Sequence, residues 1–236
     1  MTVSVLTGSA VNAIGIILGG WLGLFLTKMT ANMKDSVTKV MGIGILVLGI
    51  QMAMSTEALI AVLVCISLGA ILGEYWQIET QIHRFGDYLE NKIGHANGQF
   101  SEAFVTATLL FVIGSMGIIG AIQSGIANNH TILFTKAVMD GVLAIILTST
   151  MGSGIIFSAG PVFIYQGLIA IFANLIGKAL PNSLIEALMP EISAVGGILI
   201  IAIALNLMSI IKIRVSNILP SLLLIITFIT IRYYFW

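Results

Sequence analysis

The sequence has very few charged residues. Only 8% of its 236 residues are Asp, Glu, Lys or Arg, whereas 58% are hydrophobic and the mean hydropathy is +1.09. A soluble domain carries about a quarter charged residues, so this chain lacks the polar surface that would cover a globule in water. We therefore expect the lipid bilayer to be its solvent. The ten acidic residues balance the ten basic ones, which leaves no basic face for nucleic acid.

Cysteine and the common enzyme signatures are also scarce. The single cysteine, Cys65, lies in an apolar run and cannot form an intramolecular disulfide. The sequence contains no HExxH, CxxC or P-loop motif. All three histidines fall in predicted loops, so we expect no membrane-buried serine–histidine dyad, no metal or cofactor, and no enzymatic activity. The histidines are His83, His95 and His130.

Long apolar runs make up most of the chain. A membrane-spanning α-helix needs about 20 mostly apolar residues, and the sequence contains about eight such runs. We expect an all-α integral membrane protein with a single polytopic domain over residues 1–236. The first run lacks the features of a cleaved signal peptide, so it is expected to be a retained helix. The expected spans are 3–27, 38–55, 58–74, 102–126, 132–150, 155–177, 191–210 and 216–235.

The segment 75–100 differs from the spans because apolar residues at helical spacing alternate there with charged ones. This pattern predicts an amphipathic helix in the cytoplasmic interface, the alternative being a purely structural collar. Lys and Arg are also distributed unevenly. One side of the membrane is expected to carry seven and the other three, and the richer side should be cytoplasmic, which places both termini outside. The two groups are Lys28, Lys34, Lys39, Arg84, Lys92, Lys212 and Arg214, and then Lys136, Lys178 and Arg232.

Two apolar segments resemble each other, MGIGILVLGIQMAM at 41–54 and GGILIIAIALNLMS at 196–209. The first three spans would then repeat as the sixth to eighth, an odd offset that gives the copies opposite orientations in the membrane. Inverted repeats of this kind are typical of secondary transporters. The alternative is a chance resemblance between apolar helices. The side-chain amides that the match pairs are Gln51 with Asn206 and Asn12 with Gln166.

The fourth and sixth spans contain many helix-breaking residues, in GSMGIIGAIQSG at 114–125 and GSGIIFSAGP at 152–161. Such segments are expected to form discontinuous or re-entrant helices. Irregular backbone is tolerated within a membrane only inside protein or against a wet cavity, so these two segments favour a polar cavity.

Glycines recur every four residues in the first span (Gly15, Gly19, Gly23) and in the third (Gly69, Gly73). Small residues at this spacing let helix backbones approach closely in lipid. They predict helix-packing faces and, through them, a homo-oligomer.

Lys136 and Asp140 are the ionisable residues that stand apart from the predicted span ends. Their spacing of four puts them on one helix face, where they can pair, with Asp140 about 10 Å from the start of the helix. The functional interpretation is a polar pathway in which Asp140 binds a cation or carries a proton. The alternative is an ion pair that orients the helix. Further candidates for the site, which could equally be polar contacts between helices, are Asn12, Gln51, Gln123, Ser124, Ser158, Tyr165, Gln166 and Asn206.

Three segments, GSMGIIGAIQSGI, TKAVMDG and FSAGPVFIYQG, with the opening GSAVNAIGIILGGWLG, resemble the bacterial membrane-protein family of unknown function 554, the YqgA/YdfK-like proteins. The resemblance covers essentially the whole chain. It implies a multi-pass protein of the bacterial cytoplasmic membrane and a transporter role, and it implies no substrate.

The function expected from the sequence is transport of a small solute or ion through a polar site at the membrane midplane, coupled to protons or cations. One alternative is an ion channel of the same architecture. The other is a non-transporting scaffold or signalling protein, in which the polar residues would only join helices. The expected partners are membrane lipid, the transported solute or ion, and further copies of the chain.

Overall fold

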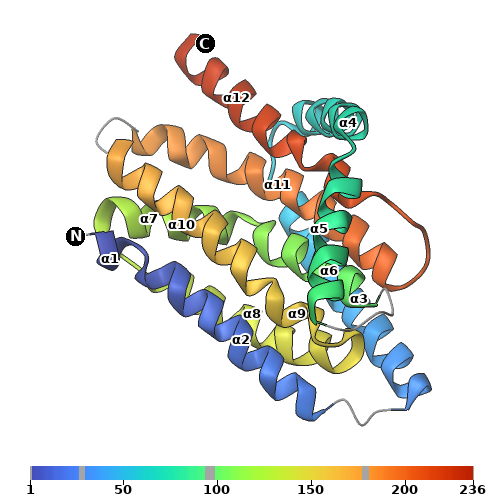
Figure 1. Ribbon diagram of the computed structural model, residues 1–236. Coiled ribbons are helices and arrows are strands. Elements are labelled where there is room, and N and C mark those ends of the chain that lie inside the picture. The colour runs from blue at the N-terminus through green and yellow to red at the C-terminus, as the bar shows by residue number, and fades with distance from the viewer. Residues whose placement is uncertain (1, 27–29, 94–98, 177–180, 236) are drawn as a thin grey trace. The chain divides into compact units, whose positions relative to one another are not determined.

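The computed structural model describes residues 2–26, 30–93, 99–176 and 181–235, and in these ranges it consists of helices and their connections (Figure 1). Among these residues, seven helices are long and apolar enough to cross a membrane, and a bent pair makes eight if it is counted as one span. The predicted all-α membrane fold is therefore confirmed. The helices are α1 (Thr2–Val5), α2 (Thr7–Phe25), α3 (Ala31–Ala53), α4 (Leu59–Trp76), α5 (Ile78–Ile93), α6 (Gln99–Val112), α7 (Ser115–Ala127), α8 (Thr131–Met151), α9 (Gly154–Phe157), α10 (Ala159–Ile176), α11 (Asn182–Leu207), the 3-10 helix η1 (Val215–Ile218) and α12 (Pro220–Phe235).

The chain folds into two compact units. The first comprises Met1–Thr38, His83–Val112 and Met116–Ala179, and in it α2 packs along α8 while α10 packs on α2 and α6. The second comprises Lys39–Ile82, Ile113–Ser115 and Leu180–Trp236, and in it α12 packs against α4 and α11. The candidate charged pair belongs to the first unit.

Close contact between α2 and α8 depends on the glycines of α2. A Cβ built on Gly19 would lie 2.1 Å from the carbonyl oxygen of Gly141, and one on Gly15 would lie 2.7 Å from that of Ala137. Such approaches leave no room for a side chain. In the second unit Gly69 faces Ser221 in the same way. These glycine faces are thus used within the chain, and assembly into a homo-oligomer stays a prediction.

The fourth predicted span is bent by 61° where α6 ends and α7 begins. Gly114, in the break, has φ +136°, a backbone conformation that residues other than glycine rarely adopt. The sixth span is interrupted less: only Ser158 separates α9 from α10. Gly152, with φ +100°, forms the reversal between α8 and α9.

The seventh predicted span begins too late. We expected residues 191–210. The structure instead starts α11 at Asn182 and carries Pro190 inside it. A proline inside a helix removes one backbone hydrogen bond, the one to the carbonyl four residues earlier, here that of Glu186, and α11 continues on both sides of it. The Ser55 hydroxyl, in the turn after α3, lies 2.9 Å from the Pro190 carbonyl oxygen.

The contact between α2 and α8 leads to a first prediction. Gly19→Ala should lower the free energy of unfolding by about 1–3 kcal/mol, because the new methyl group would meet backbone atoms that cannot move aside. Gly44→Ala is the matched control, since a Cβ there meets nothing within 4 Å. Thermal unfolding in detergent measures both. Equal stability of the two variants would contradict the close packing.

Candidate functional site

Lys136 and Asp140 form a buried ion pair in the first unit. The ammonium donates to Asp140 Oδ2 at 2.6 Å, and the two residues are 7% and 4% exposed. Asp140 lies about 13 Å along α8 from Thr131 at the helical rise. The pair is one turn apart on a single helix, as the spacing predicts. A charged pair at this depth must face protein or water.

Two side-chain amides complete the group. Asn12 of α2 and Gln166 of α10 are fully buried, and Asn12 Nδ2 donates to Gln166 Oε1 at 3.2 Å. Asn12 also lies next to the Asp140 carboxylate. Three helices thus contribute to one connected set, and we call Asn12, Lys136, Asp140 and Gln166 the polar cluster.

Helix α7 passes close to the polar cluster through Gly117. A Cβ built there would lie 3.4 Å from Lys136 Cε and 3.5 Å from Gln166 Nε2. These are ordinary van der Waals distances, so the α7 backbone at Gly117 borders the cluster directly. The bend between α6 and α7 comes just before Gly117. The backbone of the broken span therefore lies next to the site.

Some polar atoms of the cluster lack a partner among the described residues. Asn12 Oδ1, an acceptor, and Gln166 Nε2, a donor, are both buried and unpaired. The hydroxyls of Ser9 on α2 and Thr148 on α8 are in the same condition. Leaving a buried polar group unpaired costs about 1–3 kcal/mol, so these atoms are suited to bind water or a polar solute.

The remaining candidates occupy several places. Ser158 donates to the Ile155 carbonyl at the junction of α9 and α10, and Gln123 and Tyr165 are half-buried. Gln51 and Asn206 belong to the second unit. There Gln51 is exposed, and the Asn206 amide bonds the backbone of Ile213 at 2.7 and 2.8 Å. The Asn206 side chain closes the connection after α11.

The prediction excluded a membrane-buried serine–histidine dyad, but the structure does bring a serine to a half-buried histidine. Ser124 Oγ, fully buried on α7, lies 2.5 Å from His130 Nδ1 in the turn before α8. Gly8 of α2 lies close to this hydroxyl, because a Cβ built on Gly8 would be 2.8 Å from Ser124 Oγ. The sequence placed His130 in a loop correctly but could not tell that the loop folds back on α7. His83 lies within α5 instead of a loop, and His95 lies outside the described residues.

Sequence reasoning missed two buried carboxyl groups, Glu90 of α5, which is 4% exposed, and Glu191. Glu191 of α11 is 5% exposed and accepts a hydrogen bond from the Thr56 hydroxyl. It was overlooked because the predicted span began at this residue, which put it at a helix end. A prediction of one continuous helix through Pro190 would have placed Glu191 in the interior of that helix, away from its end.

A second carboxylate network anchors η1 in the second unit. Asn217 Nδ2 donates to Glu74 Oε2 at 2.6 Å, and the Ser216 backbone N–H donates to Glu79 Oε2 at 3.0 Å. Glu74 also pairs with Arg214. Because these groups satisfy one another, the network serves to fix the connection before α12.

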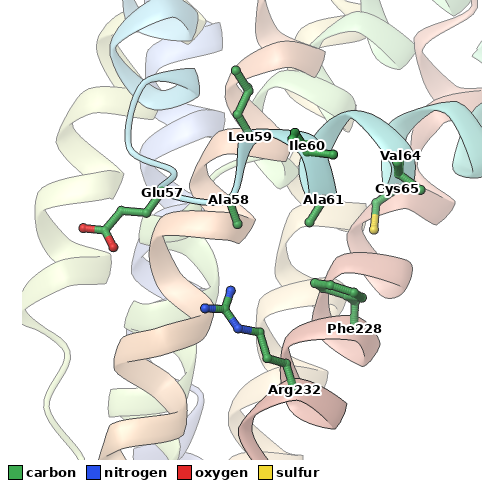
Figure 2. A pocket seen from close by; sticks show the side chains of 9 residues that line it. All are labelled: Glu57, Ala58, Leu59, Ile60, Ala61, Val64, Cys65, Phe228 and Arg232. Carbon is green, nitrogen blue, oxygen red and sulfur yellow. The ribbon is translucent and has the colours of Figure 1, made fainter. Parts of the chain in front are cut away.

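The second unit also contains a groove of about 640 Å³ between α4 and α12 (Figure 2). Its lining is apolar, with Phe228 facing Cys65, apart from Glu57 and Arg232 toward one end. A groove with so few polar groups suits an apolar chain better than a polar solute. The polar cluster is therefore the better candidate for a solute site.

Fold and site together define a polytopic α-helical membrane protein with charged side chains buried between its helices. The chain belongs to the family described as protein of unknown function (DUF554), whose profile matches residues 7–230. It is 33% identical to the uncharacterized membrane protein YdfK of Bacillus subtilis over 222 residues, 92% of this chain and 93% of that one. It is 30% identical to the uncharacterized protein YqgA of Escherichia coli over 223 residues, again 92% and 93%. No solved structure matches the chain.

The ion pair leads to a second prediction. Lys136→Met should lower the free energy of unfolding by about 3–5 kcal/mol, because it leaves the Asp140 carboxylate buried without its cation. Adding Asp140→Leu should restore most of that loss. Lys92→Met, at an exposed position of α5, is the control. Thermal unfolding in detergent measures the stability of each variant. An equal loss of stability in Lys136→Met and Lys92→Met would contradict the importance of the ion pair.

Proposed function

We propose that this protein transports a small polar solute or ion across the membrane, coupled to a proton or cation, through the polar cluster. One observation carries the proposal: a buried ion pair adjoins an unpaired acceptor, Asn12 Oδ1, and an unpaired donor, Gln166 Nε2. Polar groups that serve only to join helices are expected to satisfy one another. These two retain binding capacity beside a charged pair, as a solute site requires.

Unpaired hydroxyls continue the site along the unit. Ser9 precedes Asn12 by about one turn of α2, and Thr148 follows Asp140 by about 12 Å along α8. Since α2 and α8 run in the same direction, with Gly15 beside Ala137 and Gly19 beside Gly141, these hydroxyls lie on opposite sides of the cluster. Ser9, the polar cluster and Thr148 therefore follow one another along the contact between α2 and α8. This order favours a path for a polar species along that contact.

The helix pairings support an inverted repeat. Each helix of the first predicted copy packs against its counterpart in the second, α2 on α10 and α4 on α12. Helix α3 meets α11, with a Cβ built on Gly49 only 2.9 Å from the Gly197 carbonyl oxygen. Asn12 and Gln166, which the match equates, are bonded to each other. Contact between equivalent residues is expected at a two-fold axis, and transporters built from inverted repeats bind substrate at this position.

The charge distribution supports a location in the bacterial cytoplasmic membrane with both termini outside. Six of the seven Lys and Arg residues assigned to the cytoplasmic side lie in described segments, namely α3, α5 and the connection between α11 and η1, and Lys39 and Arg214 are examples. Lys28 and Lys178 lie outside the described residues. The positive-inside rule gives the orientation.

A third prediction concerns water access to the cluster. In a Cys65→Ala background, Gln166→Cys and Thr148→Cys should react with a membrane-impermeant thiol reagent. Asn129→Cys, at an exposed position, should react as the positive control, and Ala144→Cys, which is fully buried among apolar atoms, should not. If Gln166→Cys and Thr148→Cys stay as unreactive as Ala144→Cys, the cluster is dry and the scaffold alternative replaces transport.

A fourth prediction concerns Asp140 itself. In proteoliposomes carrying an internal pH dye, a membrane potential should drive proton flux through the native protein. Asp140→Asn, which is nearly isosteric and cannot ionise, should reduce this flux to that of empty liposomes. Glu102→Gln, at an exposed acid of α6, should retain it. Undiminished flux in Asp140→Asn, or no flux in the native protein, would overturn the coupling role of Asp140.

A further inference from the structure

The turn between α3 and α4 meets α11 through two adjacent pairs of residues in the second unit. Ser55 Oγ lies 2.9 Å from the Pro190 carbonyl oxygen and 2.7 Å from that of Met52. Thr56 Oγ1, the next hydroxyl, bonds Glu191 Oε2, the next residue of α11. One carboxylate, two hydroxyls and two carbonyl oxygens are therefore gathered where the turn crosses the helix.

This set contains more oxygen acceptors than hydrogens. A serine hydroxyl has one hydrogen, yet Ser55 Oγ is within hydrogen-bonding distance of two carbonyl oxygens. One of these two oxygen–oxygen approaches therefore lacks a hydroxyl hydrogen, and the Met52 carbonyl oxygen also accepts from the Ser55 backbone N–H at 3.2 Å. Thr56 Oγ1 accepts from the Ala58 backbone N–H at 2.8 Å, so its single hydrogen is left for Glu191. A cation placed among these lone pairs would relieve the excess of acceptors.

The local charge is also negative. Glu191 is 5% exposed, and no Lys, Arg or His of the described residues forms an ion pair with it. Helix α3 ends at Ala53, so the negative end of its dipole lies here, where it disfavours a carboxylate and favours a cation. The nearest other charged groups along these elements are Glu57 and Glu186, both exposed, with Arg232 across the groove from Glu57.

We propose that this turn binds one sodium ion, held by the Glu191 carboxylate, the Ser55 and Thr56 hydroxyls, and the carbonyl oxygens of Met52 and Pro190. Hard cations take oxygen ligands of these kinds. A single carboxylate balances a single positive charge, whereas calcium sites gather several carboxylates. Ser55 is exposed, so the ion can enter from the membrane surface. The site uses residues of the second unit alone and does not depend on the polar cluster.

The test is thermal unfolding of the purified full-length protein in detergent, titrated with NaCl or with choline chloride at equal ionic strength. A bound ion stabilises the folded state by mass action, so NaCl should raise Tm saturably and choline chloride should not. Ser55→Ala should weaken the apparent sodium affinity by about tenfold or more, the usual effect of losing one supporting group at a metal site. Glu191→Gln should abolish the sodium response, and Glu186→Gln, at an exposed acid of the same helix, should leave it unchanged.

Three results would overturn the site. Identical Tm values in NaCl and choline chloride would exclude specific binding, and stronger stabilisation by CaCl₂ or KCl would exclude sodium as the ligand. A sodium response that survives Ser55→Ala and Glu191→Gln but disappears in Asp140→Asn would assign the ion to the polar cluster. If Glu191→Gln does not fold, Ser55→Ala, which removes a single exposed hydroxyl, still decides between these outcomes.

Discussion

The close contact of α2 with α8 is the interaction on which the rest of the first unit depends. Lipid does not drive apolar helices together, so their association requires intimate packing of small residues. Glycines at 15, 19 and 23 let α2 approach the α8 backbone to a distance that any Cβ would prevent. The same contact brings Asn12 to Asp140. Without it the α8 ion pair would face hydrocarbon, at a cost of about 3 kcal/mol or more per charge.

In the polar cluster the two charges are paired with each other, whereas each of the two amides keeps one unpaired polar atom. Lys136 neutralises Asp140 at 2.6 Å, which makes the cluster tolerable in a medium of low dielectric constant. Asn12 and Gln166 share one hydrogen bond and keep a free acceptor and a free donor. If the cluster binds a solute as proposed, this division would reconcile stability with binding: the charges stabilise one another, while the amides remain open to a solute or water.

The sequence predicted the spans and the cluster's chemistry better than it predicted which faces are buried. The spacing of Lys136 and Asp140 was enough to infer their pairing, and the internal match equated Asn12 with Gln166 before their contact was known. Gln51, in contrast, proved exposed. Apolar residues surround each span on all sides, so periodicity does not mark its inner face. Ser124 with His130 and Thr56 with Glu191 depend on how turns fold back, which local pattern does not encode.

Asp140 of the first unit and Glu191 of the second are buried carboxyl groups that differ in what neutralises them. Asp140 has a lysine one turn away, so its cluster carries no net charge and suits a neutral or zwitterionic solute, or a proton that displaces the lysine. Glu191 has only the Thr56 hydroxyl among the described residues, so its charge calls for a cation. Under the two proposals made above, the solute would bind where the buried charges already cancel, and the cation would bind where a buried carboxylate has no cationic side chain to pair with.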